Sequence, residues 1–201
     1  YRQLIMVDQN RHNLSGLVRL LQIIFGLSLL FEAFGTLLFA TYFYFFGYAP
    51  TWYESLYLGL FHSISSYTNA GFDIFGNSMV DFSYDYFVQV ITMALIILGA
   101  VGFPVLVEVR EYLLCKNKKI FRFSLFTKIT SAMFFMLMFF GMLGIWIIEN
   151  DLFFADKSWH EKLFYALFNS VTTRSAGFNT MDISEFSTPT QIFLSLLMFI
   201  G

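Results

Sequence analysis

The sequence predicts an all-α integral membrane protein built from two similar helical units, and three observations support this class. Hydrophobic residues make up 57% of the 201 residues and charged residues only 13%, with a mean hydropathy of +0.65. A soluble globular domain usually carries about 25% charged residues, so this chain has too little polar surface for that class. Long apolar stretches recur along the chain, and one group of motifs occurs twice.

Three apolar stretches are long enough to cross a bilayer, which takes roughly 20 mostly apolar residues in a helix. We expect spanning helices over residues 20–46, 86–107 and 125–148, and a fourth apolar helix that begins near Thr190. Two amphipathic segments, residues 52–67 and 159–173, are too short and too polar to cross. Each precedes a stretch of small residues, 68–71 or 175–177, so each unit is expected to read helix, short helix, glycine loop, helix.

The short helices and their loops form an internal repeat. Phe61-His-Ser-Ile-Ser-Ser followed by Asn69-Ala-Gly-Phe-Asp aligns with Phe168-Asn-Ser-Val-Thr-Thr followed by Ser175-Ala-Gly-Phe-Asn. The second copy is one residue shorter. Because the same four elements recur in the same order, we interpret the two units as copies of one structure.

The distribution of charge predicts the orientation of both copies. Lys and Arg gather in residues 1–19 and 108–128, whereas residues 47–85 contain four acids and no basic residue. Because basic segments beside membrane spans stay in the cytoplasm, we expect both short helices and their loops to open to the outside. The copies are then parallel repeats, related by an axis along the membrane normal.

The two glycine loops have the chemistry of an ion filter. Irregular backbone at membrane depth is tolerated only where protein buries it or water lines it, and a ring of backbone carbonyls can replace the hydration shell of a cation. We predict that the carbonyls near Gly71 and Gly177 bind the permeant ion. The predicted filter residues are Asn69, Ala70, Gly71, Phe72, Ser175, Ala176, Gly177 and Phe178.

Within these loops, Phe72 and Phe178 are expected to pack behind the backbone and hold its carbonyls in place. The alternative interpretation is that both tripeptides are ordinary helix C-caps, a position that Gly and Asn favour. Two copies on the same side, each after a matched short helix, favour filter loops.

Two further side chains are candidates for supporting the filter. A charge at membrane depth is costly and usually functional, so we expect Arg174 to brace the second loop through an acid or backbone carbonyls; an arginine extended to the membrane surface is the alternative. His62 aligns with Asn169, which indicates a hydrogen-bonding position rather than a metal ligand. The single cysteine, Cys115, excludes a cysteine metal cluster, and the basic residues form no stripe for nucleic acid.

The segments S-I-S-S-Y-T-N-A-G-F and S-V-T-T-R-S-A-G-F resemble the second and third pore loops of the Trk/Ktr/HKT superfamily, in particular of bacterial Ktr membrane subunits of the KtrB type. The resemblance covers nearly all of the chain. It implies helix–pore-loop–helix repeats arranged in parallel around a pore, two of an expected four. It assigns residues 1–19 to a cytoplasmic linker, 20–110 to the second repeat, 111–124 to a cytoplasmic basic loop and 125–201 to a truncated third repeat.

The resemblance also implies potassium uptake, stimulated by sodium in some members, through a pore lined by one filter glycine per repeat. It implies a homodimer in the bacterial plasma membrane, in contact with lipid and seated on a cytosolic ring of nucleotide-binding regulatory subunits such as KtrA, with no covalently bound cofactor. Neither loop has the Thr-Val-Gly-Tyr-Gly filter of potassium channels, which leaves the preference for potassium over sodium open.

Two other classes of protein remain as alternatives. A polytopic membrane enzyme needs a nucleophile–base pair or a metal constellation, and the loops carry neither, so we expect no enzyme. A non-conducting scaffold would use the Ala-Gly-Phe loops only as helix caps. The apolar run over residues 192–200 is too short to span, and we expect the chain to be an internal segment of a longer polypeptide.

Overall fold

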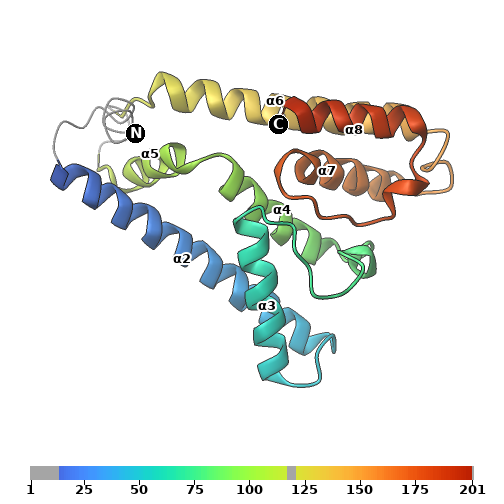
Figure 1. The fold of residues 1–201 in the computed structure, drawn as a ribbon, viewed down its shortest axis with the longest axis horizontal. Helices are drawn as coiled ribbons and strands as arrows, with labels where there is room; N and C mark the ends of the chain where they lie inside the picture. The colour runs from blue at the N-terminus through green and yellow to red at the C-terminus, as the bar shows by residue number, and fades with distance from the viewer. Residues whose placement is uncertain (1–13, 117–120, 201) are drawn as a thin grey trace.

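The computed structural model describes residues 14–116 and 121–200, and all regular elements in these two ranges are helices (Figure 1). Most of the predicted linker and part of the predicted basic loop lie outside the described residues. The helices are α2 (Leu14–Phe45), α3 (Trp52–Tyr67), α4 (Tyr86–Ala100), α5 (Phe103–Leu114), α6 (Leu125–Glu149), α7 (Trp159–Ser175) and α8 (Thr188–Ile200), with 3₁₀ turns at Val80–Phe82 and Ile183–Glu185.

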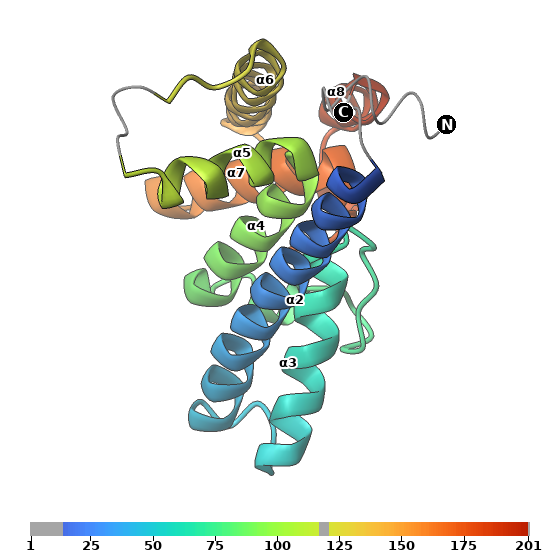
Figure 2. The ribbon, with the colours of Figure 1, turned by 90° about the vertical axis from the view of Figure 1, so that its left-hand side faces the viewer.

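The helices fall into two copies of one arrangement that run in the same direction. In each copy a long helix is followed by a short helix whose C-terminus points back into the molecule, and then by a second apolar helix that returns (Figures 1 and 2). The first copy is α2, α3 and α4, and the second is α6, α7 and α8. The all-α fold and the parallel order of its helices agree with the prediction.

Two of the described helical segments, Val18–Phe45 and Leu125–Glu149, are long and apolar enough to cross a membrane. Their outward faces are rich in exposed large apolar side chains, as expected for a surface in contact with lipid. The exposed set includes Phe25, Leu29, Phe34, Met136, Phe139 and Phe140.

The prediction of one continuous helix over residues 86–107 is wrong. The chain bends by 102° between α4 and α5. Gly102 at the break has φ +94°, a conformation that a right-handed helix cannot contain. Pro104 then lies in the first turn of α5, where its fixed φ and missing N–H are tolerated. The carboxylate of Glu108 on α5 accepts a hydrogen bond from the Ser124 N–H (3.0 Å), which ties α5 to the start of α6.

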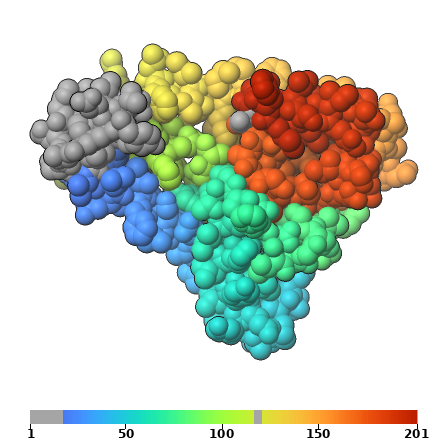
Figure 3. All heavy atoms as spheres, viewed as in Figure 1, coloured from blue at the N-terminus to red at the C-terminus, as the bar shows by residue number. Residues whose placement is uncertain are grey.

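A shared apolar core joins the two copies. Phe39, Phe43 and Ile96 of the first copy are fully buried in the same cluster as Phe168 and Phe178 of the second. Together the copies form a broad wedge in the space-filling view, with α3 and the turn before it at the narrow end (Figure 3). The core therefore fixes the position of one short helix and its loop relative to the other.

In each copy an acidic side chain links the long helix to the returning helix. In the first copy the acid belongs to the returning helix, and in the second it belongs to the long helix. Asp85, the N-cap of α4, accepts hydrogen bonds from Tyr42 (2.9 Å) in the last turns of α2 and from Tyr48 (3.1 Å) in the turn that follows it. In the second copy the acid is Glu149 at the end of α6, which accepts from the Ser187 hydroxyl (2.6 Å) and N–H (2.9 Å) just before α8. Both copies therefore have a hydrogen-bonded link between these two helices, although different residues form it.

Candidate functional site

The two predicted filter loops meet at the centre of the molecule. The Ser175 hydroxyl lies 3.1 Å from Oδ1 of Asn69, which occupies the equivalent position in the other loop. A Cβ added at Gly71 would collide with the carbonyl oxygen of Ala176. The backbone of one loop thus lies directly against the backbone of the other, at a distance that only glycine permits.

The backbone conformation separates the capping residue from the filter glycine in the first loop. Asn69 has φ +55°, and the Ala70 N–H bonds to the Ser65 carbonyl at 2.9 Å, a bond typical of a helix C-cap in which Asn takes the left-handed position. Gly71, with φ +71°, lies beyond this cap. Capping therefore explains Asn69 but gives no reason for Gly71.

In both copies a hydroxyl on the short helix holds the loop by the same bond. Ser65 donates to the carbonyl of Phe72 at 2.7 Å, and Thr172 donates to the carbonyl of Phe178 at 2.9 Å. Both hydroxyl residues are almost completely buried. These two donors fix the residue after each glycine, and they align in the internal repeat.

The carbonyls nearest the two glycines are not used in hydrogen bonds among the described residues. In the described part of the chain, the carbonyl oxygens of Ala70, Gly71, Ala176 and Gly177 accept no hydrogen bond. Carbonyls free of protein partners at a junction of two loops are able to bind water or a cation.

The two phenylalanines of the Ala-Gly-Phe tripeptides occupy different surroundings. Phe178 is fully buried, with its ring 5.2 Å from that of His62. Phe72 is 69% exposed in the described chain. Within residues 14–116 and 121–200, the ring of Phe178 therefore lies behind its loop and the ring of Phe72 does not.

His62 lies behind the loops and bonds within its own repeat. Its Nε2 is 2.9 Å from the Thr92 hydroxyl on α4. Desolvation by burial lowers the pKa of His62 to about 4, so the ring is neutral near pH 7. In the other copy the amide of Asn169, which aligns with His62, donates instead to the Tyr165 carbonyl (2.9 Å).

In the two described ranges no group of three or more His, Cys, Asp or Glu residues could hold a metal ion. His62 is placed between Thr92 and the ring of Phe178, as a packing and hydrogen-bonding residue.

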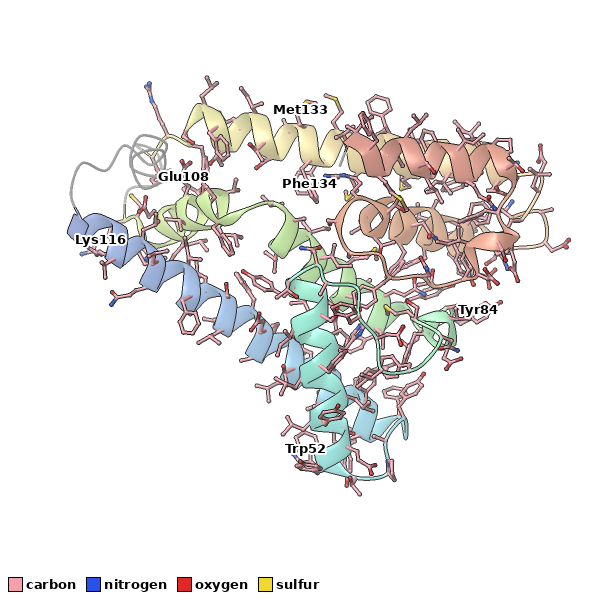
Figure 4. All side chains as sticks on the ribbon, in the orientation of Figure 1. Trp52, Tyr84, Glu108, Lys116, Met133 and Phe134 are labelled. Atoms are coloured by element: carbon pink, nitrogen blue, oxygen red, sulfur yellow. The ribbon has the colours of Figure 1, made fainter. Side chains whose placement is uncertain are left out.

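Arg174 turns away from the loops and toward the long helix of its repeat. Its Nη1 donates to the carbonyl of Phe134 at 3.1 Å, and its guanidinium lies over the Phe134 ring, 4.2 Å from the centroid. Figure 4 shows Phe134 on the inner side of α6 and Met133 on the opposite side. The equivalent residue in the first copy, Tyr67, reaches α2 in the same way, with its hydroxyl 3.3 Å from that of Ser28.

The sequence prediction missed a pair of glycines that seat the short helices. A Cβ at Gly35 would collide with the Ser63 hydroxyl, and a Cβ at Gly141 with that of Ser170. The same two serines donate to carbonyls of the long helices, at 2.8 Å and 2.7 Å. Part of the signal was present, because the two serines align in the internal repeat, whereas the two glycines lie before the aligned segments.

The fold and the paired loops define a membrane protein of duplicated helix–loop–helix units. A model of the TrkH family, described as a cation transport protein, matches residues 9–201. The chain therefore belongs to the TrkH family, and the resemblance to the Trk and Ktr proteins is confirmed.

Among proteins of this kind, the chain is 52% identical over 200 residues to Ktr system potassium uptake protein D of Bacillus subtilis. It is 31% identical over 209 residues to Ktr system potassium uptake protein B of the same organism. Both alignments cover 100% of this chain and 44% of the relative. A third relative is the potassium/sodium uptake protein NtpJ of Enterococcus hirae, 28% identical over 195 residues, which cover 96% of this chain and 41% of that protein.

The chain therefore spans less than half the length of these relatives. Their names are those of uptake proteins and not of enzymes, in agreement with the prediction. Identity is higher to protein D than to the KtrB type that the loop motifs suggested.

Proposed function

We propose that this chain supplies two of four filter loops to the pore-forming membrane subunit of a potassium uptake system. The observation that carries the proposal is the junction of the loops, where Gly71 lies against the Ala176 carbonyl and the carbonyls beside both glycines have no partner in the described chain. Carbonyl oxygens of this kind replace the hydration shell of potassium in selectivity filters. The names of the relatives, potassium uptake proteins, point to the same ion.

The electrostatics around the junction favour a cation. The C-terminal ends of α3 and α7 both lead into the loops (Figure 1), and the C-terminus of a helix carries a partial negative charge of about half an electron. Arg174, the cationic side chain nearest the loops in sequence, is directed at Phe134 on α6. Its charge is thereby held away from the proposed ion path.

The orientation, the sodium effect and the partners complete the proposal. The basic segments support an orientation in which the loops open to the outer side of the bacterial plasma membrane. Sodium acts as a second permeant or stimulating ion, since one relative is named a potassium/sodium uptake protein. The names of the Ktr relatives refer to a system, and the subunit is proposed to act as a homodimer on a KtrA-like cytosolic ring.

Rubidium uptake into liposomes by the full-length protein tests this function. Gly71→Ser and Gly177→Ser place a side chain on left-handed backbone in the two loops, so both variants are expected to lose uptake or to alter the preference for rubidium over sodium. If both transport normally with unchanged preference, the glycine loops act only as helix caps and the filter assignment is wrong. If the wild-type protein itself takes up no rubidium, a non-conducting scaffold is favoured.

A further inference from the structure

Two adjoining cavities with arginines in their walls lie where α2 begins beside α5, on the side of the molecule away from the loops (Figure 1). Their volumes are about 390 Å³ and 340 Å³, and both are lined by Arg19 of α2 and Arg110 of α5. Within the described residues neither arginine forms an ion pair. Glu111, which has interactions of its own, also lines the second cavity, so the arginines still leave a positive charge there.

The bend at Gly102 is what brings the two arginines together. Because α5 turns by 102° from the direction of α4, it returns to the first turns of α2 and contacts it. Arg19 lies at the start of the apolar stretch Val18–Phe45, and the beginning of a spanning helix is the depth of lipid headgroups. Arginine presents a planar fork of donors that matches a phosphate group at this depth.

Below the arginines the wall becomes aliphatic. Ile23, Leu27 and Leu30 line the first cavity together with Arg19, and their spacing places them along one face of α2. At 1.5 Å per residue, the distance from Arg19 to Leu30 is about 16 Å. This is close to half the hydrocarbon thickness of a bilayer, about 15 Å, so the apolar wall is as long as one leaflet is deep.

Gly26 keeps this wall open. It lines the first cavity in the middle of the aliphatic face, and no atom lies within 4 Å of the position that a Cβ would take. A glycine within a helix costs about 1 kcal/mol relative to alanine, and no backbone conformation requires it here, since Gly26 has no positive φ. The open space is the local feature that distinguishes this position.

We propose that these cavities form a binding site for an anionic phospholipid, with its phosphate between Arg19 and Arg110 and an acyl chain along α2 over Gly26. The charge of the arginines complements an anionic headgroup, and the length of the aliphatic face matches one acyl chain. The leaflet is the cytoplasmic one, which rests on the orientation proposed above. The site lies on the opposite side from the loops and is separate from the ion path.

The test uses the full-length protein in nanodiscs of equal parts phosphatidylglycerol and phosphatidylcholine, extracted in mild detergent, with retained lipids counted by native mass spectrometry. Wild type is expected to retain phosphatidylglycerol in preference. The double variant Arg19→Gln/Arg110→Gln is expected to reduce this preference at least about tenfold, since two charge-assisted contacts are lost. Arg122→Gln, an exposed arginine outside both cavities, is the matched control and is expected to retain the lipid as wild type does.

Gly26→Leu separates a lipid from a free anion. Leucine strengthens the helix but fills the acyl-chain position, so it is expected to lower retention while the protein remains folded, and inorganic phosphate is expected not to displace the lipid. Equal retention by wild type and the arginine double variant would overturn the site. Full displacement by phosphate with no effect of Gly26→Leu would also overturn it, in favour of a free-anion site.

The result is independent of the proposed transport function. A Gly71→Ser variant is expected to retain phosphatidylglycerol as wild type does, whatever its rubidium uptake. If Gly71→Ser and Gly177→Ser transport normally while wild type retains phosphatidylglycerol, the filter assignment is wrong and the lipid site stands. If both variants lose uptake while wild type shows no preference for phosphatidylglycerol, only the lipid site is rejected.

Discussion

Replacing Gly71 by alanine tests the close approach of the two loops. The Cβ of alanine would collide with the Ala176 carbonyl oxygen, which belongs to the backbone and can move only if the second loop moves. Gly76 provides the matched control, because it also has positive φ, +92°, but meets no atom within 4 Å of an added Cβ. Both variants carry the left-handed strain of about 1–2 kcal/mol.

The difference in uptake between Gly71→Ala and Gly76→Ala measures the cost of the collision. Overpacking against a fixed group costs about 1–3 kcal/mol, and every 1.4 kcal/mol in a barrier changes a rate tenfold. If this cost falls on the conducting arrangement of the loops, Gly71→Ala lowers uptake roughly 5- to 150-fold. Gly76→Ala, in an exposed turn, lowers thermal stability but leaves uptake within about twofold of wild type.

The assay is rubidium uptake by equal amounts of full-length protein in liposomes, with a thermal melt of each variant in detergent. The melt separates loss of folded protein from loss of conduction. Gly71→Ala with more than half of wild-type uptake, or Gly76→Ala with an equally large loss, would refute the reasoning from the loop contact.

Three further outcomes are expected. Ser65→Ala and Thr172→Val each remove the donor to a loop carbonyl, at about 0.5–1.5 kcal/mol, and each should weaken the preference for rubidium over sodium in competition uptake; unchanged preference in both would show that these bonds do not shape the loops. Arg174→Gln loses its bond and ring contact with Phe134 and should lower the melting temperature without altering ion preference, and the reverse pattern would place the charge in the ion path. The pKa of His62 is lowered by burial to about 4, below about 6.5 in an unfolded chain. The neutral ring therefore contributes fully to the free energy of unfolding above pH 6.5, and this contribution falls by up to about 3 kcal/mol as the pH falls toward 4. His62→Asn should flatten this part of a stability profile in pH, and a profile parallel to wild type would contradict a buried neutral ring.

The long helices and the repeat were predictable from sequence alone. Hydropathy over about 20 residues depends only on composition, and it located α2 and α6 to within a few residues at their C-terminal ends. The break at Gly102 was missed although Gly102 and Pro104 lie in that stretch, since the apolar residues on both sides keep its mean hydropathy high.

The partners inside the loops were not predictable in the same way. Which hydroxyl of Ser63, Ser65 and Ser66 reaches the loop depends on the rotation of α3 about its axis, and that rotation is set by packing against α2 and α4. The direction of Arg174 likewise depends on where α6 passes the end of α7. Sequence indicated the residue types, and tertiary packing decided their partners.

The position shared by Tyr67 and Arg174 has a consequence for how such a molecule changes over time. Both side chains reach back to the long helix of their own copy from the same place, one with a neutral hydroxyl and the other with a guanidinium. In an assembly of identical chains around an axis, an arginine here would appear in every chain and bring several cations close to one another. Because the copies are joined in one polypeptide, a substitution at this position changes one copy alone. The molecule can therefore gain one arginine here without gaining one in every copy.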